Sequence, residues 1–436
     1  MSEAGWIELS VADCLANSFA GEWGTEPNPA NALVLRATDI DNDGHVVGVG
    51  VGRFIPRAKL EAKQLQDGDI LLEGSGGSPD KPVGRVALFE AEAHTGPAIC
   101  SNFFKTLRPK RSVVYDRFLW RKLGWFYNQP ALLALQQQTT GIINLKFAEY
   151  LQARIEVPAL LPEQKKIAET LDTLDTCIRQ TAAIIDKLKQ VKRGLLHDLL
   201  TRGIDVNGEL RPPQSQAPHL YKDSPLGWIP QAWDVCRLAD YMACDITYGI
   251  VQAGPHVEGG VPYIRTGDMA GDRLDAASLL RTSRRIADSY RRSEVRAGEI
   301  VIAIRATVGK VLPVPSELDG ANLTQGTARL APNRHTNAQF LLWALRHQRA
   351  QNSISAEIKG TTFAEITLAA LRGVPLAAPI DVLEQQHIGE RLMACESRIS
   401  AEVRQQQKLV KQKSGLVEDL LTGRVRVTPL LDASRA

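Results

Sequence analysis

Two stretches of the chain decide its fold: EQKKIAETLDTLDTCIRQTAAIIDKLKQVKRGLLHDLLTRGI at residues 163–204 and EQQHIGERLMACESRISAEVRQQQKLVKQKSGLVEDLLTGRV at residues 384–425. Adding 221 to each position of the first gives the second without a gap, and 15 of the 42 positions are identical. Chance would give only a few identities. The chain is therefore a tandem duplication.

Each stretch has the apolar spacing of a long helix, with steps that alternate between four and three residues. No proline interrupts the first stretch, and Pro162 suits its first turn. We therefore predict a coiled-coil helix in each half. The predicted contact residues are Ile167, Leu171, Leu174, Ile178, Leu188, Leu195 and Leu199 in the first helix and Ile388, Leu392, Ile399, Leu409, Leu416 and Leu420 in the second.

Neither helix can bury its apolar stripe alone, and two arrangements are open. Each helix could pack on its own domain, or the two could pair as an antiparallel coiled coil. Both stripes are far longer than the average globular helix of about 11–12 residues, which favours pairing. The stripe is broken at Thr181 and Lys192, and the second helix carries a polar gap at residues 402–407. That gap is either where the pair loosens or where a partner docks.

The repeat extends into the segment before each helix. Gly5-Trp6-Ile7 returns as Gly227-Trp228-Ile229, and Cys14 returns as Cys236, both at an offset of 222. Short apolar runs between glycines and prolines predict strands, with one aromatic helix near each domain's end. The predicted fold class is α+β, with two tandem mixed α/β domains, each followed by a long helix. The predicted boundaries are 1–160 and 226–381 for the domains, 161–204 and 382–425 for the helices, 205–225 for a Pro-rich linker and 426–436 for a tail.

Composition and motifs exclude several classes of function. The chain has 436 residues, 44% hydrophobic and 23% charged, and a net charge of +3. Its six cysteines form no CxxC pair, so neither a zinc site nor a disulfide framework is indicated, and they fit a reducing cytoplasm. No apolar run approaches the ~18 residues of a membrane span. We find no dinucleotide, Walker, H-E-x-x-H or G-x-S-x-G motif, so we predict no catalytic residues and no cofactor or metal site.

Basic residues cluster inside both domains, as binding to a phosphate backbone requires. An isolated charge run is usually a solvated helix face, but two runs in related domains favour nucleic acid. The runs are Lys105, Arg108, Lys110, Arg111, Arg117, Arg121 and Lys122 in the first domain and Arg281, Arg284, Arg285, Arg291, Arg292 and Arg296 in the second.

Polar loops at predicted strand ends form a second candidate surface, because Arg, Asn, Gln and Thr read base edges. Each position alone is weak evidence, since polar loop residues are common. These predicted DNA-binding residues are Arg36, Arg53, Ser75, Ser78, Lys81 and Arg85 in the first domain and Tyr248, Arg265, Thr266, Arg305, Thr307, Lys310, Asn322, Thr324 and Gln325 in the second.

The combination of motifs resembles the DNA-specificity subunit of Type I restriction-modification systems. The likeness rests on the helix entries PALLPEQKKIAETL (158–171) and PIDVLEQQHIGERL (379–392) and on the helix ends GLLHDLLT (194–201) and GLVEDLLT (415–422). It rests also on SPLGWIP (224–230) and on the turn Gly360-Thr361-Thr362-Phe363.

This resemblance implies a subunit without catalytic activity, whose two target-recognition domains each bind one half of a split double-stranded DNA sequence. It implies that the paired helices act as a spacer and dock two methyltransferase subunits, with restriction and translocase subunits joining for cleavage. S-adenosylmethionine and ATP are then expected on those partners. Two other hypotheses stay open: a DNA-binding regulator or scaffold that dimerises through its helices, and a self-contained methyltransferase, which would need a cofactor site.

Overall fold

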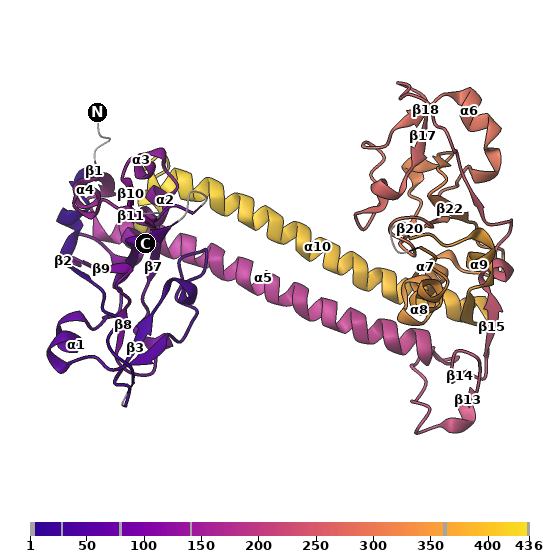
Figure 1. Cartoon of the computed structure of the whole chain (residues 1–436), viewed down its shortest axis with the longest axis horizontal. Coiled ribbons are helices and arrows are strands. Elements are labelled where there is room, and N and C mark those ends of the chain that lie inside the picture. The colour runs from indigo at the N-terminus through magenta and orange to yellow at the C-terminus, as the bar shows by residue number, and fades with distance from the viewer. Residues whose placement is uncertain (1–4, 28, 78–80, 140–141, 361–363, 434–436) are drawn as a thin grey trace. The chain divides into compact units, whose positions relative to one another are not determined.

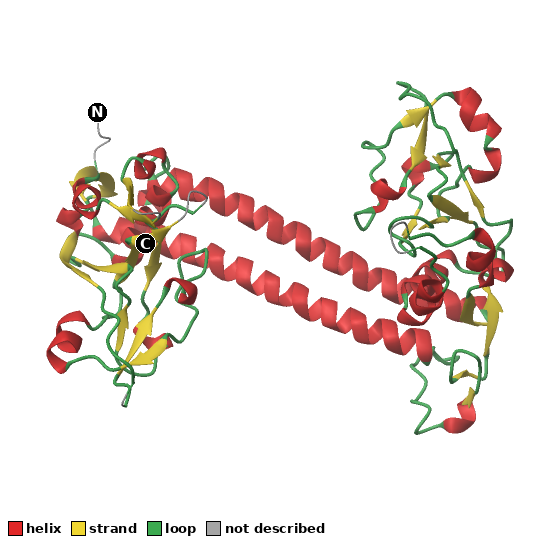
Figure 2. Cartoon of the chain, in the orientation of Figure 1, coloured by secondary structure: helices red, strands yellow, loops and turns green. Residues whose placement is uncertain are grey.

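The computed structural model describes residues 5–27, 29–77, 81–139, 142–360 and 364–433 (Figures 1 and 2). Of the predicted residues, Ser78 and the turn residues Thr361, Thr362 and Phe363 lie outside these ranges. The chain forms two compact units, Met1–Ala182 with Gln405–Ala436, and Ala183–Arg404. Each unit contains one globular domain and half of each long helix.

The first unit contains four small sheets. A central antiparallel sheet has the order β2 (Leu15–Ala20), β9 (Phe104–Pro109), β5 (Ile70–Glu73), β7 (Val86–Leu88), and a second has the order β4 (Val51–Arg53), β3 (Ala32–Leu35), β8 (Ala98–Cys100). The others are β1 (Trp6–Ser10) with β12 (Arg154–Pro158), and β10 (Gln136–Thr139), β11 (Ile142–Leu145), β6 (Ser75–Gly77). The short helices are α1 (Arg57–Lys63), α2 (Asp116–Tyr127), α3 (Pro130–Leu133) and α4 (Phe147–Gln152).

The second unit repeats this topology. Its central sheet has the order β16 (Thr247–Tyr248), β22 (Thr327–Leu330), β19 (Ile300–Ala303), β20 (Val311–Pro313), and its second sheet has the order β18 (Arg281–Thr282), β17 (Val261–Ile264), β21 (Asn322–Leu323). The pairs are β15 (Trp233–Arg237) with β23 (Pro375–Pro379) and β13 (Tyr221–Lys222) with β14 (Ile229–Pro230). The short helices are α6 (Arg284–Ser289), α7 (Ala338–Arg346), α8 (Gln348–Ala356) and α9 (Leu368–Gly373). The predicted fold class of two tandem mixed domains is confirmed.

Strand register corrects the predicted alignment of the two domain openings. Trp6 pairs with Pro158, and Trp233 pairs with Pro379, where the two prolines are 221 residues apart. Trp6 is therefore equivalent to Trp233, and the match with Trp228 is wrong. The match of Cys14 with Cys236 is wrong for the same reason, since Cys236 lies within β15 whereas Cys14 follows β1. Pairing with the strand before the long helix fixes the register, and a short aromatic identity does not.

The segment predicted as a Pro-rich linker is anchored within the second unit at two of its residues. The side chain of Arg211 forms a two-bond ion pair with buried Glu384, at 2.6 and 2.9 Å. Tyr221 is buried, and its hydroxyl donates to the carbonyl of Pro212 at 2.6 Å. Arg211 and Tyr221 pack here because each has a polar partner.

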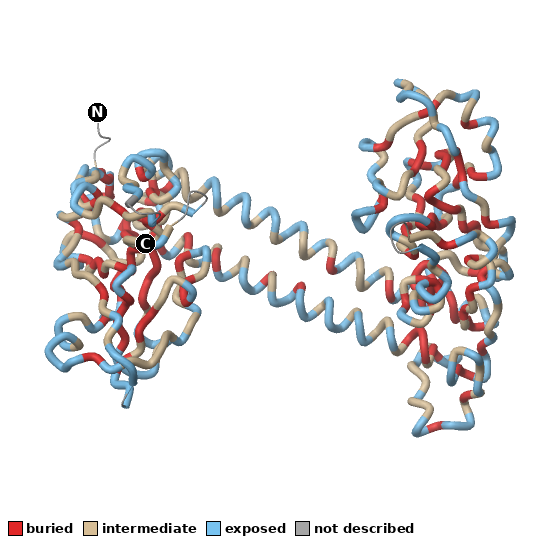
Figure 3. Tube along the Cα trace, viewed as in Figure 1, coloured by how far each residue is buried: buried red, intermediate tan, exposed pale blue. Residues whose placement is uncertain are grey.

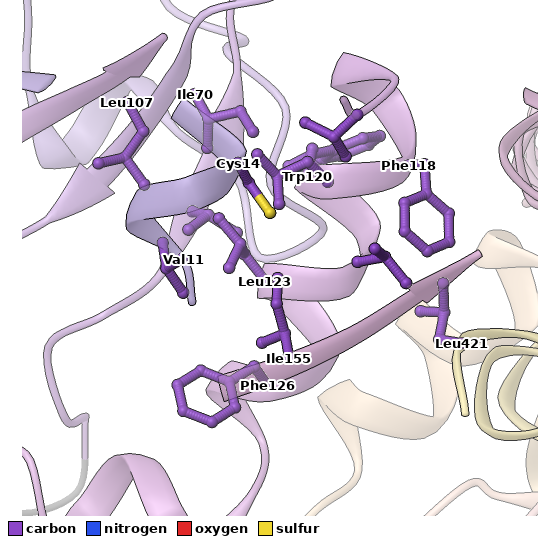
Figure 4. Close-up of a cluster of buried hydrophobic side chains, with 14 of the residues drawn as sticks. Val11, Cys14, Ile70, Leu107, Phe118, Trp120, Leu123, Phe126, Ile155 and Leu421 are labelled. Atoms are coloured by element: carbon purple, nitrogen blue, oxygen red, sulfur yellow. The ribbon is translucent and has the colours of Figure 1, made fainter. Parts of the chain in front are cut away.

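Helix α2 joins the core of the first domain to the end of a long helix. Its aromatic residues Phe118, Trp120 and Phe126 are buried with residues of the central sheet and with Leu421, as Figure 4 shows. Each fully buried side chain of this size contributes about 1.5–3 kcal/mol. The same helix carries part of the predicted basic run.

Lys122 and Arg121 are buried in this joint, so the prediction that they belong to a phosphate-binding run is wrong. The ammonium of Lys122 donates to the carbonyl of Leu421 at 2.6 Å and lies 4.5 Å from the ring centre of Trp125. Cations at the carboxyl end of a helix satisfy its unpaired carbonyls. Burial lowers the pKa of Lys122 to about 8.

This lowered pKa predicts a pH dependence of stability. Between about pH 8 and the unfolded value of about 10.4 the unfolded chain binds more protons than the folded chain, so Lys122 makes stability rise with pH. Relative to Lys122→Met, the wild-type free energy of unfolding should rise by about 2 kcal/mol from pH 7.5 to 10. Denaturant titrations at a series of pH values measure this difference. Lys110→Met, at an exposed position, is the control, and its free energy of unfolding should change with pH as that of wild type does. The same pH dependence in Lys122→Met and wild type would contradict the lowered pKa of Lys122.

Candidate nucleic-acid interface and helix pair

The long helices α5 (Leu161–Thr201) and α10 (Val382–Leu421) pack against each other within each unit. In the first unit, Ile167 and Leu171 share a buried cluster with Leu420 and Leu421. In the second unit, Leu199 of α5 shares a cluster with Ile388 and Leu392 of α10. The start of each helix thus lies beside the end of the other, so the pair is antiparallel.

Every predicted contact residue of the two helices lies on the covered face. Most of the remaining positions are exposed, which Figure 3 shows as pale blue along both helices. Thr181, where the apolar stripe is broken, is buried as well. The buried contact residues are Ile167, Leu171, Leu199, Ile388, Leu392, Ile399 and Leu420, and the half-buried ones are Leu174, Ile178, Leu188, Leu195, Leu409 and Leu416.

One ion pair between the helices occurs twice. In the second unit, Nζ of Lys192 lies 2.5 Å from a carboxylate oxygen of Glu396. In the first unit, Nζ of Lys413 lies 2.5 Å from a carboxylate oxygen of Asp175. Lys192 and Lys413 are 221 residues apart, as are Asp175 and Glu396. The residue that broke the predicted stripe is therefore half of a repeated contact that specifies register, as polar groups in helix seams do.

The two acids of this repeated contact differ in their surroundings. Asp175 also receives an ion pair from the buried side chain of Arg121, which connects the helix pair to α2. Burial would raise the pKa of Asp175, but Lys413 and Arg121 hold that pKa below its usual value. The carboxylate is therefore charged at neutral pH, as the contact requires.

The glutamates that open the two repeats hold the end of the partner helix. Glu163 is fully buried and accepts two bonds from Arg426, at 2.6 and 2.8 Å. Glu384 is buried and accepts two bonds from Arg211, at 2.6 and 2.9 Å. Both arginines come from the segment that follows the other long helix. Two-bond arginine–carboxylate contacts of this kind combine strength with fixed geometry.

The glutamine after each glutamate ties the domain to its helix. Gln164 accepts from the backbone of Tyr115 at 2.7 Å and donates to the carbonyl of Pro158 at 2.8 Å. Gln385 makes the same contacts with Asn337 and Pro379, at 2.8 and 2.9 Å. The sequence analysis missed these roles, and the identity of the Glu-Gln pair in both repeats was the available signal.

In the second domain the structure gathers most of the predicted loop residues. Thr324 forms an isolated β-bridge with Ile250, and its backbone N–H donates to the carbonyl of Ile264 at 3.1 Å. Gly326 lies close enough to Thr266 that an added Cβ would be 3.1 Å from its methyl group. The residues brought together are Tyr248, Arg265, Thr266, Arg305, Thr324 and Gln325, and we call them the polar edge.

Several side chains of this domain that were predicted to bind DNA form hydrogen bonds or ion pairs within the domain. Arg265 forms two bonds with Asp268, at 3.0 and 2.8 Å, and Arg305 forms one with Glu365, at 2.9 Å. Asn322 is 1% exposed, and its amide donates to the carbonyls of Ala287 and Tyr290. Its side chain is therefore structural in this chain and does not reach a base edge.

The basic run of the second domain lies on the surface. Arg284, Arg285 and Arg291 are exposed, and Asp288 lies 3.5 Å from Arg284 and 3.6 Å from Arg291. The run lies beside β16, because the hydroxyl of Thr247 donates to the carbonyl of Arg292 at 3.3 Å. These exposed guanidinium groups suit contacts with a phosphate backbone.

In the first domain the predicted residues are spread over three places. Ser75, Lys81, Arg85 and Lys105 gather around the end of β5 near Glu73, which binds Arg85 at 2.8 Å. Arg36 and Arg53 lie at opposite ends of the β3–β4 region, Arg36 held by Asp39 at 3.0 Å and Arg53 stacked 4.9 Å from the Trp23 ring. Arg108, Lys110 and Arg111 lie near the other end of β9, with Arg108 held by Asp69 at 2.8 Å and Arg111 by Asp116 at 3.0 Å.

Arg36 and Arg265 occupy the same turn in the two domains. Each begins a short 3-10 helix and donates from Nε and Nη2 to the aspartate three residues later. A paired guanidinium is less available to a ligand, so these two arginines stabilise the turn. The exposed aromatic Trp23 beside Arg53 is a surface feature that the sequence analysis did not single out.

The described residues contain no candidate metal site and no candidate membrane-spanning helix. No group of three or more His, Cys, Asp and Glu residues there could hold a metal ion. None of the helices described is both long and apolar enough to cross a membrane.

Comparison with known proteins gives consistent matches. The family model for the Type I restriction modification DNA specificity domain matches residues 54–190 and 230–411. The Type I restriction enzyme MjaVIII specificity subunit of Methanocaldococcus jannaschii is 24% identical over 380 residues, covering 85% of this chain and 83% of the relative. The EcoBI specificity subunit of Escherichia coli is 26% identical over 222 residues, covering 49% of this chain and 46% of the relative.

Solved structures show the same fold. The crystal structure of the Type I restriction-modification S subunit from M. genitalium has a TM-score of 0.58 at 15% identity, covering 96% of this chain and 97% of that chain. A chain from work on complex assembly and conformational transition of the type I R-M system has a TM-score of 0.51 at 18% identity, covering 96% and 98%.

The repeated ion pair predicts a charge-swap result. Glu396→Lys should destabilise the second unit by about 1 kcal/mol, because it places two ammonium groups face to face, and Lys192→Glu should do the same with two carboxylates. The double variant should recover most of the loss. Thermal unfolding of the two single variants and the double variant gives the coupling energy. Glu390→Lys, at an exposed position of α10, is the matched control. Additive effects of Lys192→Glu and Glu396→Lys would show that the ion pair does not stabilise the helix register.

Proposed function

Because the chain belongs to the family of Type I restriction-modification DNA-specificity proteins, we propose that each of its domains reads one half of a bipartite DNA target. Proteins of this family select the DNA sequence and leave catalysis to other subunits. The family also implies DNA binding and assembly with other restriction-modification subunits.

The observation that carries the proposal is one fold present twice with different surface residues. Both domains have the same strand order in the central sheet, in the second sheet and in the strand pair that precedes the long helix, and the same Glu-Gln attachment to the helix pair. Their loops differ, with Tyr248 and Gln325 at the polar edge of the second domain and Trp23 with Arg53 in the first. Two domains of one topology with different polar loops suit two different DNA sequences.

The helix pair would set the spacing of the two half-sites, since a two-helix coiled coil is stiff and its register is specified by paired charges. We propose further that it docks two methyltransferase subunits, that restriction and translocase subunits join them, and that those partners bind S-adenosylmethionine and ATP. The chain itself would need no cofactor. The proposed place of action is the cytoplasm, which the six free cysteines support.

The alternative of a scaffold that dimerises through its helices is less favoured. In both units the apolar face of each helix is covered by the other helix of the same chain. A dimer would have to replace these contacts, including the buried ion pairs of Glu163 and Glu384. The family match supports the specificity subunit instead.

Selection from random DNA tests the proposal. The chain assembled with its methyltransferase subunits should select two short motifs separated by an unspecified spacer. Gln325→Ala should relax one motif, by about 1–3 kcal/mol for the base concerned, and leave the other intact. Lys81→Ala in the first domain, at an exposed predicted position, is the matched variant and should relax only the other motif. A single continuous motif, or no sequence preference with the partners present, would refute the proposal.

A further inference from the structure

A cleft of about 1010 Å³ lies within the second unit, between α5 and the globular domain. One wall is formed by α5, a second wall by the turn that precedes β20, and the floor includes α7 and a residue of α10 (Figure 1 locates α5, α7, α10 and β20). It is separate from the predicted base-reading residues except for Thr307 and Lys310, which belong to its loop wall.

The cleft carries an excess of positive charge. Its lining contains the cations Lys189, Lys192, Arg193, Lys310 and Arg346 and three carboxylates, Asp186, Asp272 and Glu396. Glu396 forms an ion pair with Lys192 at 2.5 Å, and the largely exposed Asp272 forms one with Lys310 at 3.5 Å. Within the described residues, no ion pair joins Lys189 or Arg193 to a carboxylate. Of the lining residues, Asp186 remains beside Lys189, Arg193 and Arg346, so the five cations exceed the three carboxylates by two charges.

The floor of the cleft adds a half-buried cation that lacks an acid. The guanidinium of Arg346 donates to the carbonyl of Val311 at 3.1 Å and lies 4.9 Å from the Trp343 ring centre. Lys192 lies 4.9 Å from the same ring, so two cations share it. Burial lowers the pKa of Arg346, and the indole nitrogen of Trp343 is buried without an acceptor among the described residues. An anion in the cleft would offset the free-energy cost of the partly buried charges of Arg346 and Lys192.

The described residues of the first unit carry only part of this cluster. The 221-residue offset places exposed Val410 and Ser414 where the second unit has Lys189 and Arg193. The equivalent of Lys310 is Arg85, which Glu73 holds at 2.8 Å. The same offset places Lys411 at the position of Gln190 and Lys413 at that of Lys192, so the first unit keeps cations nearby but none at the positions of Lys189 and Arg193.

We propose that this cleft binds a phosphate of the DNA backbone, so that α5 contacts DNA beside the half-site read by the second domain. The inference rests on the proposed DNA-binding function. Continuity with the polar edge favours DNA over an acidic protein segment, because the loop that carries Arg305 at that edge continues through Thr307 to Lys310 in the cleft. Arg and Lys together are the usual phosphate contacts.

This arrangement gives the long helix a second role. A phosphate contact carries no base information, so it raises affinity equally for all sequences. The contact made by Lys189 and Arg193 lies beside one half-site only, because the first unit has Val410 and Ser414 at these positions. The two ends of the target would then depend differently on salt.

Salt titration of DNA binding tests the proposal. The chain with its methyltransferase subunits is titrated with a duplex carrying the selected target, and fluorescence anisotropy gives Kd from about 50 to 200 mM salt. Lys189→Gln/Arg193→Gln should make the slope of log Kd against log salt shallower by about 1–2 and weaken binding about tenfold at 100 mM. Lys310→Gln, on the opposite wall, should act in the same direction and leaves the helix sequence unchanged.

The matched control is Arg398→Gln/Lys408→Gln, which removes two exposed charges from α10 outside the cleft and should leave the slope unchanged. Circular dichroism verifies that all variants keep their helix content. Phosphate ethylation interference should show contacts flanking one half-site that disappear in Lys189→Gln/Arg193→Gln.

Each other outcome overturns the proposal in its own way. Unchanged DNA binding with weaker retention of the methyltransferase would identify an acidic protein segment as the occupant. An altered base preference would assign the cleft to base reading. If the wild-type complex binds no target selectively, the proposed function itself fails, and this result is distinct from a normal wild type with unaffected variants.

Discussion

The structure depends on one contact, the ion pair between a lysine of one long helix and a carboxylate of the other. An apolar stripe tolerates sliding by a heptad, because one leucine fits the place of another. A lysine and an acid that meet inside the seam do not tolerate it, since sliding would leave both charges unpaired and partly desolvated. Lys192 with Glu396 and Lys413 with Asp175 impose the same register in both units.

The second constraint is the Glu-Gln pair at the start of each long helix. Glu163 and Glu384 hold the segment that follows the partner helix, while Gln164 and Gln385 hold the backbone of the adjacent domain. Domain, helix start and helix end therefore meet at one buried polar network. Such networks stabilise a structure only when every member is satisfied, which explains why a Glu and a Gln are needed together.

Much of this architecture could be predicted from sequence because it follows from a periodic apolar pattern and from an internal repeat. The helix pair follows from apolar spacing, and the duplication follows from a gapless offset. The failures have a common cause, since each depended on a partner distant in sequence. Lys122 was predicted to be a surface cation, but it is buried against the carbonyl of Leu421. Arg211 was predicted to lie in a linker, but it forms an ion pair with Glu384. Trp228 was matched to Trp6 by local identity, although strand pairing selects Trp233.

The separation of these two kinds of contact has a consequence for how the chain can change. Residues that fix the architecture are buried and paired, whereas Tyr248 is exposed and Gln325 half-buried in loops where substitutions cost little stability. Loop residues can therefore vary without loss of the register that the helix pair maintains. The cleft of the second unit shows the same freedom on a helix, because Lys189 and Arg193 replace Val410 and Ser414 on its outward side while the seam stays intact. A duplicated fold held together by its seam thus allows its two halves to acquire different surfaces and different ligands.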